Sequence, residues 1–182
     1  MTCVCGIRTE NGVWIGADSI VTYPWYGHRR MRGVKVFRRI MSNEEQFVIG
    51  SCGSPRMLQL LQYQLNLTET ATQSGIAYMV TEFVEVVREL FKNAGVAKVE
   101  NNEESGGLFL AAYDGALYRI DSDYQVMEME DGMMAIGSGD DWALGAMKAR
   151  EDLEPEARIR CGLETASYFT GTVGPPFVIE KL

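Results

Sequence analysis

The chain has 182 residues, a hydrophobic fraction of 46% and a formal net charge of −8. A chain of this length can bury a substantial core, and we expect a single domain over residues 1–182. The negative charge argues against general binding to nucleic acids or anionic membranes. No apolar run is long enough to span a bilayer and no signal-peptide pattern opens the chain, so the expected compartment is the cytoplasm.

The first third of the chain is typical of β-strands. The expected strands are residues 3–8, 13–17, 34–38 and 47–51. Asn11-Gly12 lies between the first two and favours a tight hairpin turn. Residues 22–32 are polar and aromatic and predict a loop, in which the basic cluster at 29–32 is a solvated segment.

Two helices are expected in the middle of the chain. Ser54-Pro55 resembles a helix start, because proline suits the first helical position. Ser74-Gly75 precedes a second helix, which Gly95 ends. Its apolar residues recur at steps of three and four and form one stripe, made of Ile76, Met79, Val80, Phe83, Val84, Val87, Leu90 and Phe91.

The last part of the chain alternates again between strand and helix signals. Residues 98–107 are polar and predict a loop, and residues 108–120 predict a hairpin that turns at Asp114-Gly115. Further strands are expected at 125–129, 133–136 and 177–179, and helices from Asp140 and over 155–168. Strands and helices in this order predict an α+β fold.

The four cysteines, at positions 3, 5, 52 and 161, show no regular disulfide framework. Cys3 and Cys5 are two residues apart, so on a strand they share a face. A zinc site would need all four thiolates to converge and lacks the usual spacing. The better interpretation is buried small apolar residues, and we expect no metal and no cofactor.

Thr2 follows the initiator Met1 and opens a strand-like run. Removal of Met1 leaves an N-terminal threonine, which carries a nucleophile and a base in one residue. Its hydroxyl can attack a carbonyl, and its free amine, with a pKa of roughly 7.7–8.0, can take the hydroxyl proton near neutral pH. A Met-Thr start is common, so this hypothesis depends on the motifs that accompany it.

Three short motifs accompany Thr2: Gly-Ala-Asp-Ser at 16–19, Gly-Val-Lys-Val at 33–36 and Ala-Ile-Gly-Ser-Gly at 135–139. Together they resemble the proteasome β-type subunits, especially the bacterial and phage members and the bacterial ATP-dependent proteasome-like peptidase. The resemblance covers nearly the whole chain, and the spacing from Thr2 to Asp18 is one of its specific parts. It implies a four-layer αββα sandwich of the N-terminal nucleophile hydrolase type.

The resemblance also assigns roles to individual residues. It makes Lys35 the cation beside the threonine, with Asp18 as the partner that orients it and keeps it charged. A cation there disfavours the charged form of the Thr2 amine and so lowers the amine pKa. Gly53 would give its backbone N–H to the oxyanion, and Ser138 would help to relay the amine proton. From the residues alone, Asp18, Gly53 and Ser138 are equally turn residues, and Lys35 is equally a solvated strand lysine.

The C-terminal part departs from the family pattern. Relatives carry an Asp, then two residues, then Ser or Thr before Gly, whereas this chain has Ser-Tyr-Phe-Thr-Gly at 167–171. Thr170 matches the hydroxyl position, and we expect it in the site. Ser167 stands in the place of the acid, and a neutral hydroxyl cannot polarise a proton relay as a carboxylate would. Glu164, one helical turn back, is the candidate replacement.

The leading hypothesis is a threonine-type endopeptidase subunit that hydrolyses polypeptides, with Thr2 as nucleophile after Met1 removal. The resemblance implies a homo-oligomeric double ring and allows an ATPase unfoldase ring as a further partner. Two alternatives stay open: a catalytically silent ring-forming homologue, and an N-terminal nucleophile amidase that acts on a non-peptide amide. A Ser-His-Asp or Cys-His mechanism would have to use His28, the one histidine, whose context favours the surface.

Overall fold

A computed structural model describes residues 2–23, 27–30, 34–67 and 72–182. Its strands are β1 (Cys3–Thr9), β2 (Gly12–Ala17), β3 (Ile20–Tyr23), β4 (Gly27–Arg30), β5 (Val36–Ile40), β6 (Gln46–Cys52), β7 (Lys98–Glu100), β8 (Glu103–Ser105), β9 (Leu108–Tyr113), β10 (Ala116–Ile120), β11 (Val126–Met127), β12 (Met133–Gly137) and β13 (Val178–Lys181). Its helical segments are α1 (Pro55–Tyr63), α2 (Gly75–Tyr78), the π-helical turn η1 (Met79–Phe83), α3 (Val84–Asn93), α4 (Asp140–Ala149) and α5 (Pro155–Thr170).

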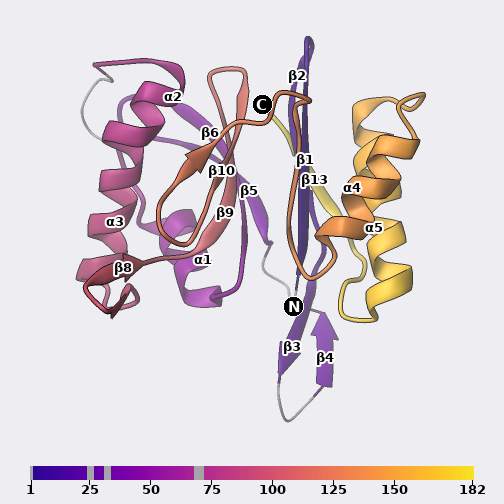
Figure 1. The fold of residues 1–182 in the computed structure, drawn as a ribbon, viewed down its shortest axis with the longest axis horizontal. Coiled ribbons are helices and arrows are strands. Elements are labelled where there is room, and N and C mark those ends of the chain that lie inside the picture. The colour runs from indigo at the N-terminus through magenta and orange to yellow at the C-terminus, as the bar shows by residue number, and fades with distance from the viewer. Residues whose placement is uncertain (1, 24–26, 31–33, 68–71) are drawn as a thin grey trace.

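Two antiparallel sheets face each other in the middle of the molecule (Figure 1). The four-stranded sheet has the order β12-β1-β2-β13, and the five-stranded sheet has the order β11-β10-β9-β6-β5. The helices α1, α2 and α3 cover the outer side of the five-stranded sheet, and α4 and α5 cover the outer side of the other. The mixed helix and strand content expected from the sequence is confirmed.

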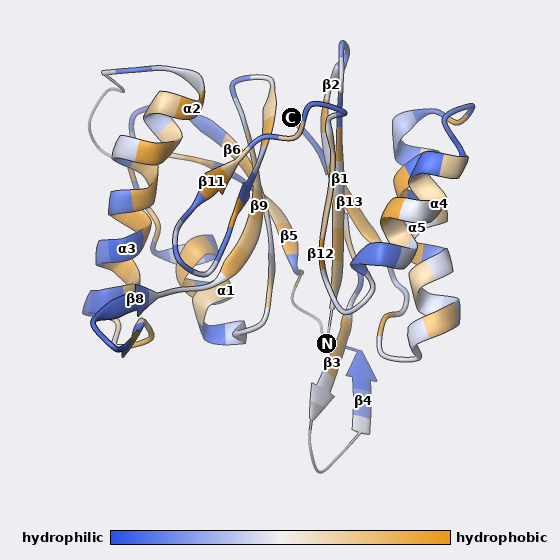
Figure 2. Cartoon of the chain, viewed as in Figure 1, coloured by the Kyte–Doolittle hydropathy of each residue, from blue (hydrophilic) through white to orange (hydrophobic). Residues whose placement is uncertain are grey.

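Strand alternation decides which side chains lie between the sheets. In β1, Val4 belongs to the core between the sheets, whereas Cys3 and Cys5 pack toward α4 and α5. Figure 2 shows hydrophobic residues on the side of α3 that faces the sheet and hydrophilic residues on its outer side. Thr2 stands two residues before Val4, so alternation aims its side chain between the sheets, toward the five-stranded sheet.

Large apolar side chains pack the helices onto the five-stranded sheet. The Phe47 ring stacks on Phe83 and on Tyr113, with centroids 4.9 and 4.6 Å apart. Tyr78 from α2 joins the same cluster, 4.9 Å from Tyr113. Rings of this size bury a large area each, so this cluster supplies much of the hydrophobic stabilisation.

Small residues pack α4 and α5 onto the four-stranded sheet. A Cβ on Gly16 of β2 would overlap Ile159 of α5. A Cβ on Gly162 would stand 3.1 Å from the carbonyl oxygen of Ala143, where the two helices cross. The helices therefore approach the sheet and each other more closely than larger side chains would allow.

Two expected loops are in fact hairpins. Residues 22–32 were expected to be a loop, but β3 and β4 pair there, with Thr22 opposite His28; residues 24–26 and 31–33 lie outside the described part. Residues 98–107 contain the pair β7 and β8. Both hairpins are rich in polar residues, so they lack the apolar alternation that reveals a strand. The predicted hairpin over 108–120 is confirmed, and both turn residues, Asp114 and Gly115, have positive φ.

The second predicted helix is interrupted by the π-helical turn η1. Met79 and Phe83 are buried as expected, but Ile76 and Val80 are 46% and 49% exposed. A π-turn adds about one residue to a helical turn and so rotates the following residues relative to the preceding ones. A single stripe at constant spacing was therefore wrong for the N-terminal end of this helix.

Within the described ranges, no helix combines the length and the apolar character needed to cross a membrane.

Candidate active site

Thr2 lies immediately before β1 and is 7% exposed. Its backbone is held from the neighbouring strand: the Ser138 hydroxyl donates to the Thr2 carbonyl oxygen at 3.4 Å. Gly137 has a φ of 101°, and a Cβ there would overlap the same carbonyl oxygen. Only glycine fits this position without strain, so the conformation of Gly137 and the location of Thr2 depend on each other.

Lys35 joins Thr2 to Asp18. Its Nζ donates to Thr2 Oγ1 at 3.0 Å, to Asp18 Oδ1 at 2.8 Å and to the Ile20 carbonyl oxygen at 2.6 Å. Lys35 lies in a bend just before β5 and is 5% exposed. The solvated position that alternation also allowed is therefore wrong, because the lysine precedes the strand and does not follow its pleat.

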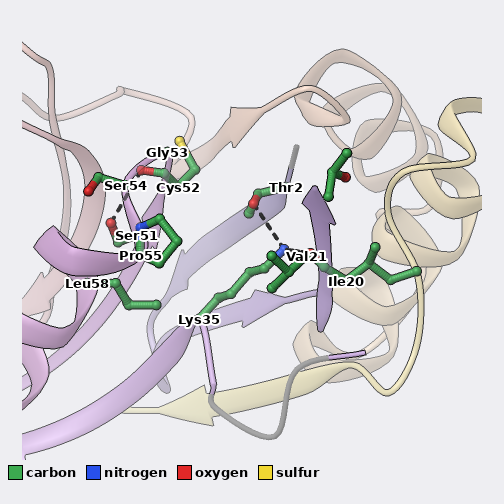
Figure 3. A pocket seen from close by; sticks show the side chains of 11 residues that line it. Thr2, Ile20, Val21, Lys35, Ser51, Cys52, Gly53, Ser54, Pro55 and Leu58 are labelled. Carbon is green, nitrogen blue, oxygen red and sulfur yellow. Dashed lines mark hydrogen bonds between the residues drawn. The ribbon is translucent and has the colours of Figure 1, made fainter. Parts of the chain in front are cut away.

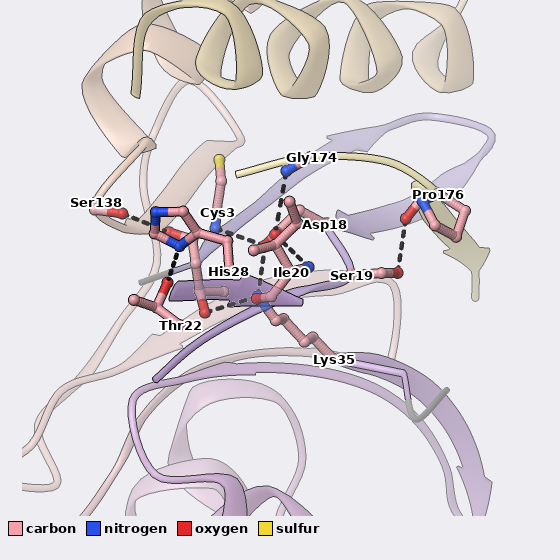
Figure 4. Close-up of polar contacts among 11 residues, drawn as sticks. Cys3, Asp18, Ser19, Ile20, Thr22, His28, Lys35, Ser138, Gly174 and Pro176 are labelled. Atoms are coloured by element: carbon pink, nitrogen blue, oxygen red, sulfur yellow. Dashed lines mark hydrogen bonds and ion pairs between the residues drawn. The ribbon is translucent and has the colours of Figure 1, made fainter. Parts of the chain in front are cut away.

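Asp18 follows β2 and is held by hydrogen bonds from several parts of the chain (Figure 4). Its exposed fraction is 1%. Its Oδ1 accepts the backbone N–H of Cys3 at 3.0 Å in addition to Lys35. Its Oδ2 accepts the N–H of Ile20 at 2.9 Å and that of Gly174 at 3.4 Å. Four donors on one carboxylate satisfy a buried charge and hold it in a single orientation.

Burial lowers the pKa of the Lys35 ammonium below its usual 10.5, and the nearby Asp18 carboxylate opposes this effect. The balance keeps a cation in a buried place where its field is strong. The contact with Thr2 Oγ1 puts this cation at the oxygen that would become negatively charged on losing its proton. The site can therefore favour a threonine alkoxide over the neutral hydroxyl.

A pocket of about 120 Å³ opens beside Thr2 (Figure 3). In the figure, Thr2 and Lys35 lie on one side, and the segment from Ser51 to Leu58 lies on the other. Its lining consists of Thr2, Ile20, Val21, Thr22, Lys35, Ser51, Cys52, Gly53, Ser54, Pro55 and Leu58. Gly53 is exposed, has a φ of 90°, and has open space within 4 Å of where a Cβ would stand. A ligand in the pocket can thus approach its backbone closely.

The chain matches no family model. Among solved structures, Thiobacillus denitrificans BPH in complex with epoxomicin is 22% identical, with a TM-score of 0.81 over 100% of this chain and 98% of that chain. Eukaryotic HslV from Trypanosoma brucei is 23% identical, with a TM-score of 0.68 over 100% and 99% of the two chains. Anbu, the ancestral beta-subunit, from Yersinia bercovieri is 17% identical, with a TM-score of 0.68 over 100% and 81%.

The chain has the proteasome-like fold. The resemblance to proteasome β-type subunits is thereby confirmed at the level of the fold. Solved structures that are less than 25% identical show the fold alone. The roles of individual residues therefore have to be argued from the geometry of this chain.

Of the six expected site residues, Thr2, Asp18 and Lys35 form one hydrogen-bonded group, Ser138 contacts Thr2, and Gly53 lines the pocket. Thr170 differs: it ends α5, and its hydroxyl donates to the Ala166 carbonyl oxygen at 2.8 Å. Its proton is thus committed to the helix, and only its lone pairs remain for a role in the site.

The replacement acid suggested by the sequence does not lie in a suitable place. Glu164 is exposed on α5, and Ser167 is half-buried. Ser167 lies near the loop before β13, since its Oγ is 3.8 Å from where a Cβ on Gly174 would stand. The Gly174 N–H binds Asp18, so Ser167 stands behind the aspartate and not beside the Thr2 hydroxyl.

Some site groups had no signal in the sequence. The Ile20 carbonyl and the Gly174 N–H are backbone groups, which any residue could provide. Cys52 also lines the pocket, and its place next to Gly53 in the sequence could have indicated this. His28 is exposed on β4, as expected, and its Nδ1 lies 2.9 Å from the Thr22 hydroxyl.

Proposed function

We propose that this chain is a threonine-type endopeptidase subunit in which Thr2, once Met1 is removed, is the N-terminal nucleophile. The observation that carries the proposal is the buried group in which Lys35 Nζ lies 3.0 Å from Thr2 Oγ1 and 2.8 Å from Asp18 Oδ1. A fully desolvated cation is expensive to bury. Its placement on a threonine hydroxyl has a clear use in catalysis and little in packing.

In the proposed reaction, the Thr2 amine takes the hydroxyl proton and Oγ1 attacks the peptide carbonyl. Lys35 stabilises the negative charge on the attacking oxygen, and the Gly53 N–H stabilises the charge on the carbonyl oxygen. The C–N bond then breaks, and the leaving amine takes the proton from the Thr2 ammonium. Water hydrolyses the resulting ester and regenerates Thr2. Ser138 holds the Thr2 backbone through the Thr2 carbonyl oxygen. Thr170 is proposed to support the transfer of the amine proton through the lone pairs of its hydroxyl oxygen.

The two facing sheets with helices outside them are proposed to form the four-layer αββα sandwich of the N-terminal nucleophile hydrolases, in one domain over residues 1–182. A homo-oligomeric double ring in the cytoplasm, with an ATPase unfoldase ring as a further partner, completes the proposal. The likeness in fold to HslV and to Anbu supports assembly from repeated copies, since the Anbu complex from Pseudomonas aeruginosa is described as a helical assembly. The four cysteines are free, which suits a reducing compartment.

A catalytically silent ring subunit is the second candidate. The specific observation that favours it is Ser167, which occupies the place of the acid while Glu164 is exposed. The silent subunit would keep Met1, whereas the enzyme must lose it.

The test begins with the intact mass of the purified protein, which should show the loss of one methionine. Turnover of a fluorogenic peptide is then compared between wild type, Thr2→Ala and the control Thr9→Ala, a threonine at the far end of β1. Thr2→Ala should abolish turnover and leave assembly unchanged by light scattering, and Lys35→Ala should lower kcat by about 10²-fold or more. Epoxomicin should inhibit the wild type.

Unchanged turnover in Thr2→Ala would refute the threonine mechanism. A wild type that keeps Met1 and shows no turnover would favour the silent subunit. A stable monomer at micromolar concentration would refute the ring.

A further inference from the structure

The turn between β12 and α4 lies against the Thr2 end of β1. Gly137 pairs with Cys3 in the sheet, and Ser138 donates to the Thr2 carbonyl oxygen. A Cβ on Gly139 would stand 3.0 Å from the Cys3 Cβ. Asp140 follows at once as the first residue of α4 and is half-buried. These contacts fix the backbone of Asp140 close to the end of β1 at which the Thr2 amine forms.

The negative charge of Asp140 also acts on the opposite wall of the Thr2 pocket. Cys52 lines this pocket together with Thr2 and Lys35. Burial raises the pKa of the Cys52 thiol to about 11, with Asp140 as the next contribution, ahead of the opposing effects of Arg119 and Lys35. The charge of Asp140, two residues after Ser138, is therefore felt at the pocket wall that Cys52 forms.

The carboxylate of Asp140 can still accept hydrogen bonds from a cation, whereas the carboxylate of Asp18 is already fully hydrogen-bonded. Asp18 accepts four hydrogen bonds, from Lys35 and from three backbone N–H groups. Among the described residues, the Asp140 carboxylate accepts one, from the backbone N–H of Asp141 at 2.9 Å. A carboxylate has about four lone-pair positions, so most of the Asp140 carboxylate is available.

We propose that Asp140 is a positioning residue whose carboxylate stabilises the positive charge that the Thr2 amine acquires when it takes the hydroxyl proton. The inference rests on the proposed function, because only a Thr2 freed of Met1 has this amine. The physical role is that of an acid which stabilises a base after protonation without accepting the proton itself. Asp140 would make the Thr2 amine a stronger base, in opposition to Lys35, which makes it weaker.

The other charged and titratable groups around the amine cannot take this role. Lys35 has the wrong sign, Asp18 is committed, and Cys52 is held neutral by its raised pKa. His28 on β4 and Arg119 on β10 provide no negative charge. Glu164 on α5 and Asp141 on α4 are carboxylates, but both are exposed.

The competing explanation is that Asp140 only stabilises the start of α4. Carboxylates in the first helical turn are favourable because of the positive end of the helix dipole. Asp141 occupies the same turn, is exposed and carries the same charge. It therefore provides a matched control for net charge and for the helix, without a half-buried place at the end of β1.

The experiment compares processed wild type, Asp140→Asn, Asp141→Asn and Asp140→Glu, with Met1 removal checked by intact mass. Peptide turnover is measured as a function of pH with an uncharged substrate, together with thermal stability. In Asp140→Asn, kcat should fall by about 3- to 10-fold and the acid limb of kcat/KM should move to lower pH by about half a unit, because the Thr2 amine becomes a weaker base. Asp140→Glu should restore the wild-type limb.

Asp141→Asn should leave kcat and the limb unchanged while lowering the melting temperature as much as Asp140→Asn does. An acid limb in Asp140→Asn that coincides with that of Asp141→Asn would overturn the inference, and so would a limb displaced to higher pH. If Thr2→Ala is inactive, either of these two acid limbs refutes the role of Asp140 and leaves the proposed function in place. An active Thr2→Ala would refute both the proposed function and this role.

Discussion

Facing the five-stranded sheet, the helices present rings such as Phe83 and Phe91; facing the four-stranded sheet, α5 presents the aliphatic side chains Ile159, Leu163 and Ala166. The first interface is filled by stacked aromatic side chains. In the second, Gly16 of β2 lets the Ile159 side chain approach the sheet, and Gly162 lets α5 approach the backbone of α4 where the two helices cross.

The more closely packed of the two interfaces is the one on the sheet that carries Thr2. Large rings bury much apolar area, whereas at Gly16 and Gly162 even one added methyl group would force neighbouring atoms to move. Thr2 begins β1, a central strand of the sheet that small residues hold. A catalytic group must be held to within a fraction of an ångström. We infer that the aromatic interface mainly provides stability, and the small-residue interface mainly provides position.

The largest expected effect is on stability, from Phe83→Ala. Phe83 is fully buried and stacks on Phe47, so the substitution leaves a cavity and should lower the free energy of unfolding by about 3–5 kcal/mol. Denaturant unfolding measures this loss, with the half-exposed Val80→Ala as control. The fraction that stays folded should keep wild-type kcat. A selective loss of kcat in folded protein would contradict the division of roles.

Gly137→Ala should lower kcat strongly, in contrast to Phe83→Ala, which should lower stability and leave kcat unchanged. The new Cβ overlaps the Thr2 carbonyl oxygen at a strained φ, so the start of β1 must move and kcat should fall by about 10²-fold. The control is Gly145→Ala on α4, where a Cβ meets open space and should stabilise the helix by about 0.5–1 kcal/mol. Equal turnover in the two variants would show that Thr2 is not held by this contact.

A smaller effect is expected from Gly16→Ala, which lies beneath α5. Its Cβ would overlap Ile159, and overpacking of this kind lowers the free energy of unfolding by about 1–3 kcal/mol. The displacement should also reach Asp18 at the end of the same strand, so kcat should fall more than stability alone explains. Ile159→Ala removes the overlapping Cγ2, so the losses from Gly16→Ala and Ile159→Ala should be less than additive, and a double-mutant cycle measures this coupling.

The last test changes no residue and has no effect near neutral pH. Because burial lowers the pKa of Lys35 below 10.5, the ammonium loses its proton at a lower pH than an ordinary lysine does. The alkaline limb of kcat should therefore have its midpoint below pH 10.5, since neutral Lys35 cannot stabilise the alkoxide. Circular dichroism over the same range controls for unfolding. A limb at or above this value in folded protein would remove the role of the Lys35 charge.

The sequence indicated the fold and most of the site through side chains that carry chemistry. Thr2, Asp18 and Lys35 were expected together and form one hydrogen-bonded group. Alternation misjudged Lys35, because a bend before β5 takes it out of the strand pattern. The hairpin of β3 and β4 was missed because β4 is polar and exposed along its whole length, so it shows no apolar alternation.

Other features depend on tertiary contacts that no local pattern encodes. The turn η1 shifts Ile76 and Val80 to the surface although their spacing is helical. The Thr170 hydroxyl matched a motif, yet in the fold it bonds its own helix at Ala166. Backbone donors and acceptors, such as Gly174 and Ile20, leave no mark on residue identity at all.

The Asp18 carboxylate joins parts of the chain that are far apart along the sequence. It holds the N–H of Cys3, which leaves the ribosome early, and that of Gly174, which leaves it 171 residues later by their numbers. The aspartate that binds the Thr2 end of β1 is therefore fully bound only after the segment of Gly174 has been synthesised. A nascent chain that stops before Gly174 thus carries Thr2, Asp18 and Lys35 without the full set of hydrogen bonds that holds the aspartate between them.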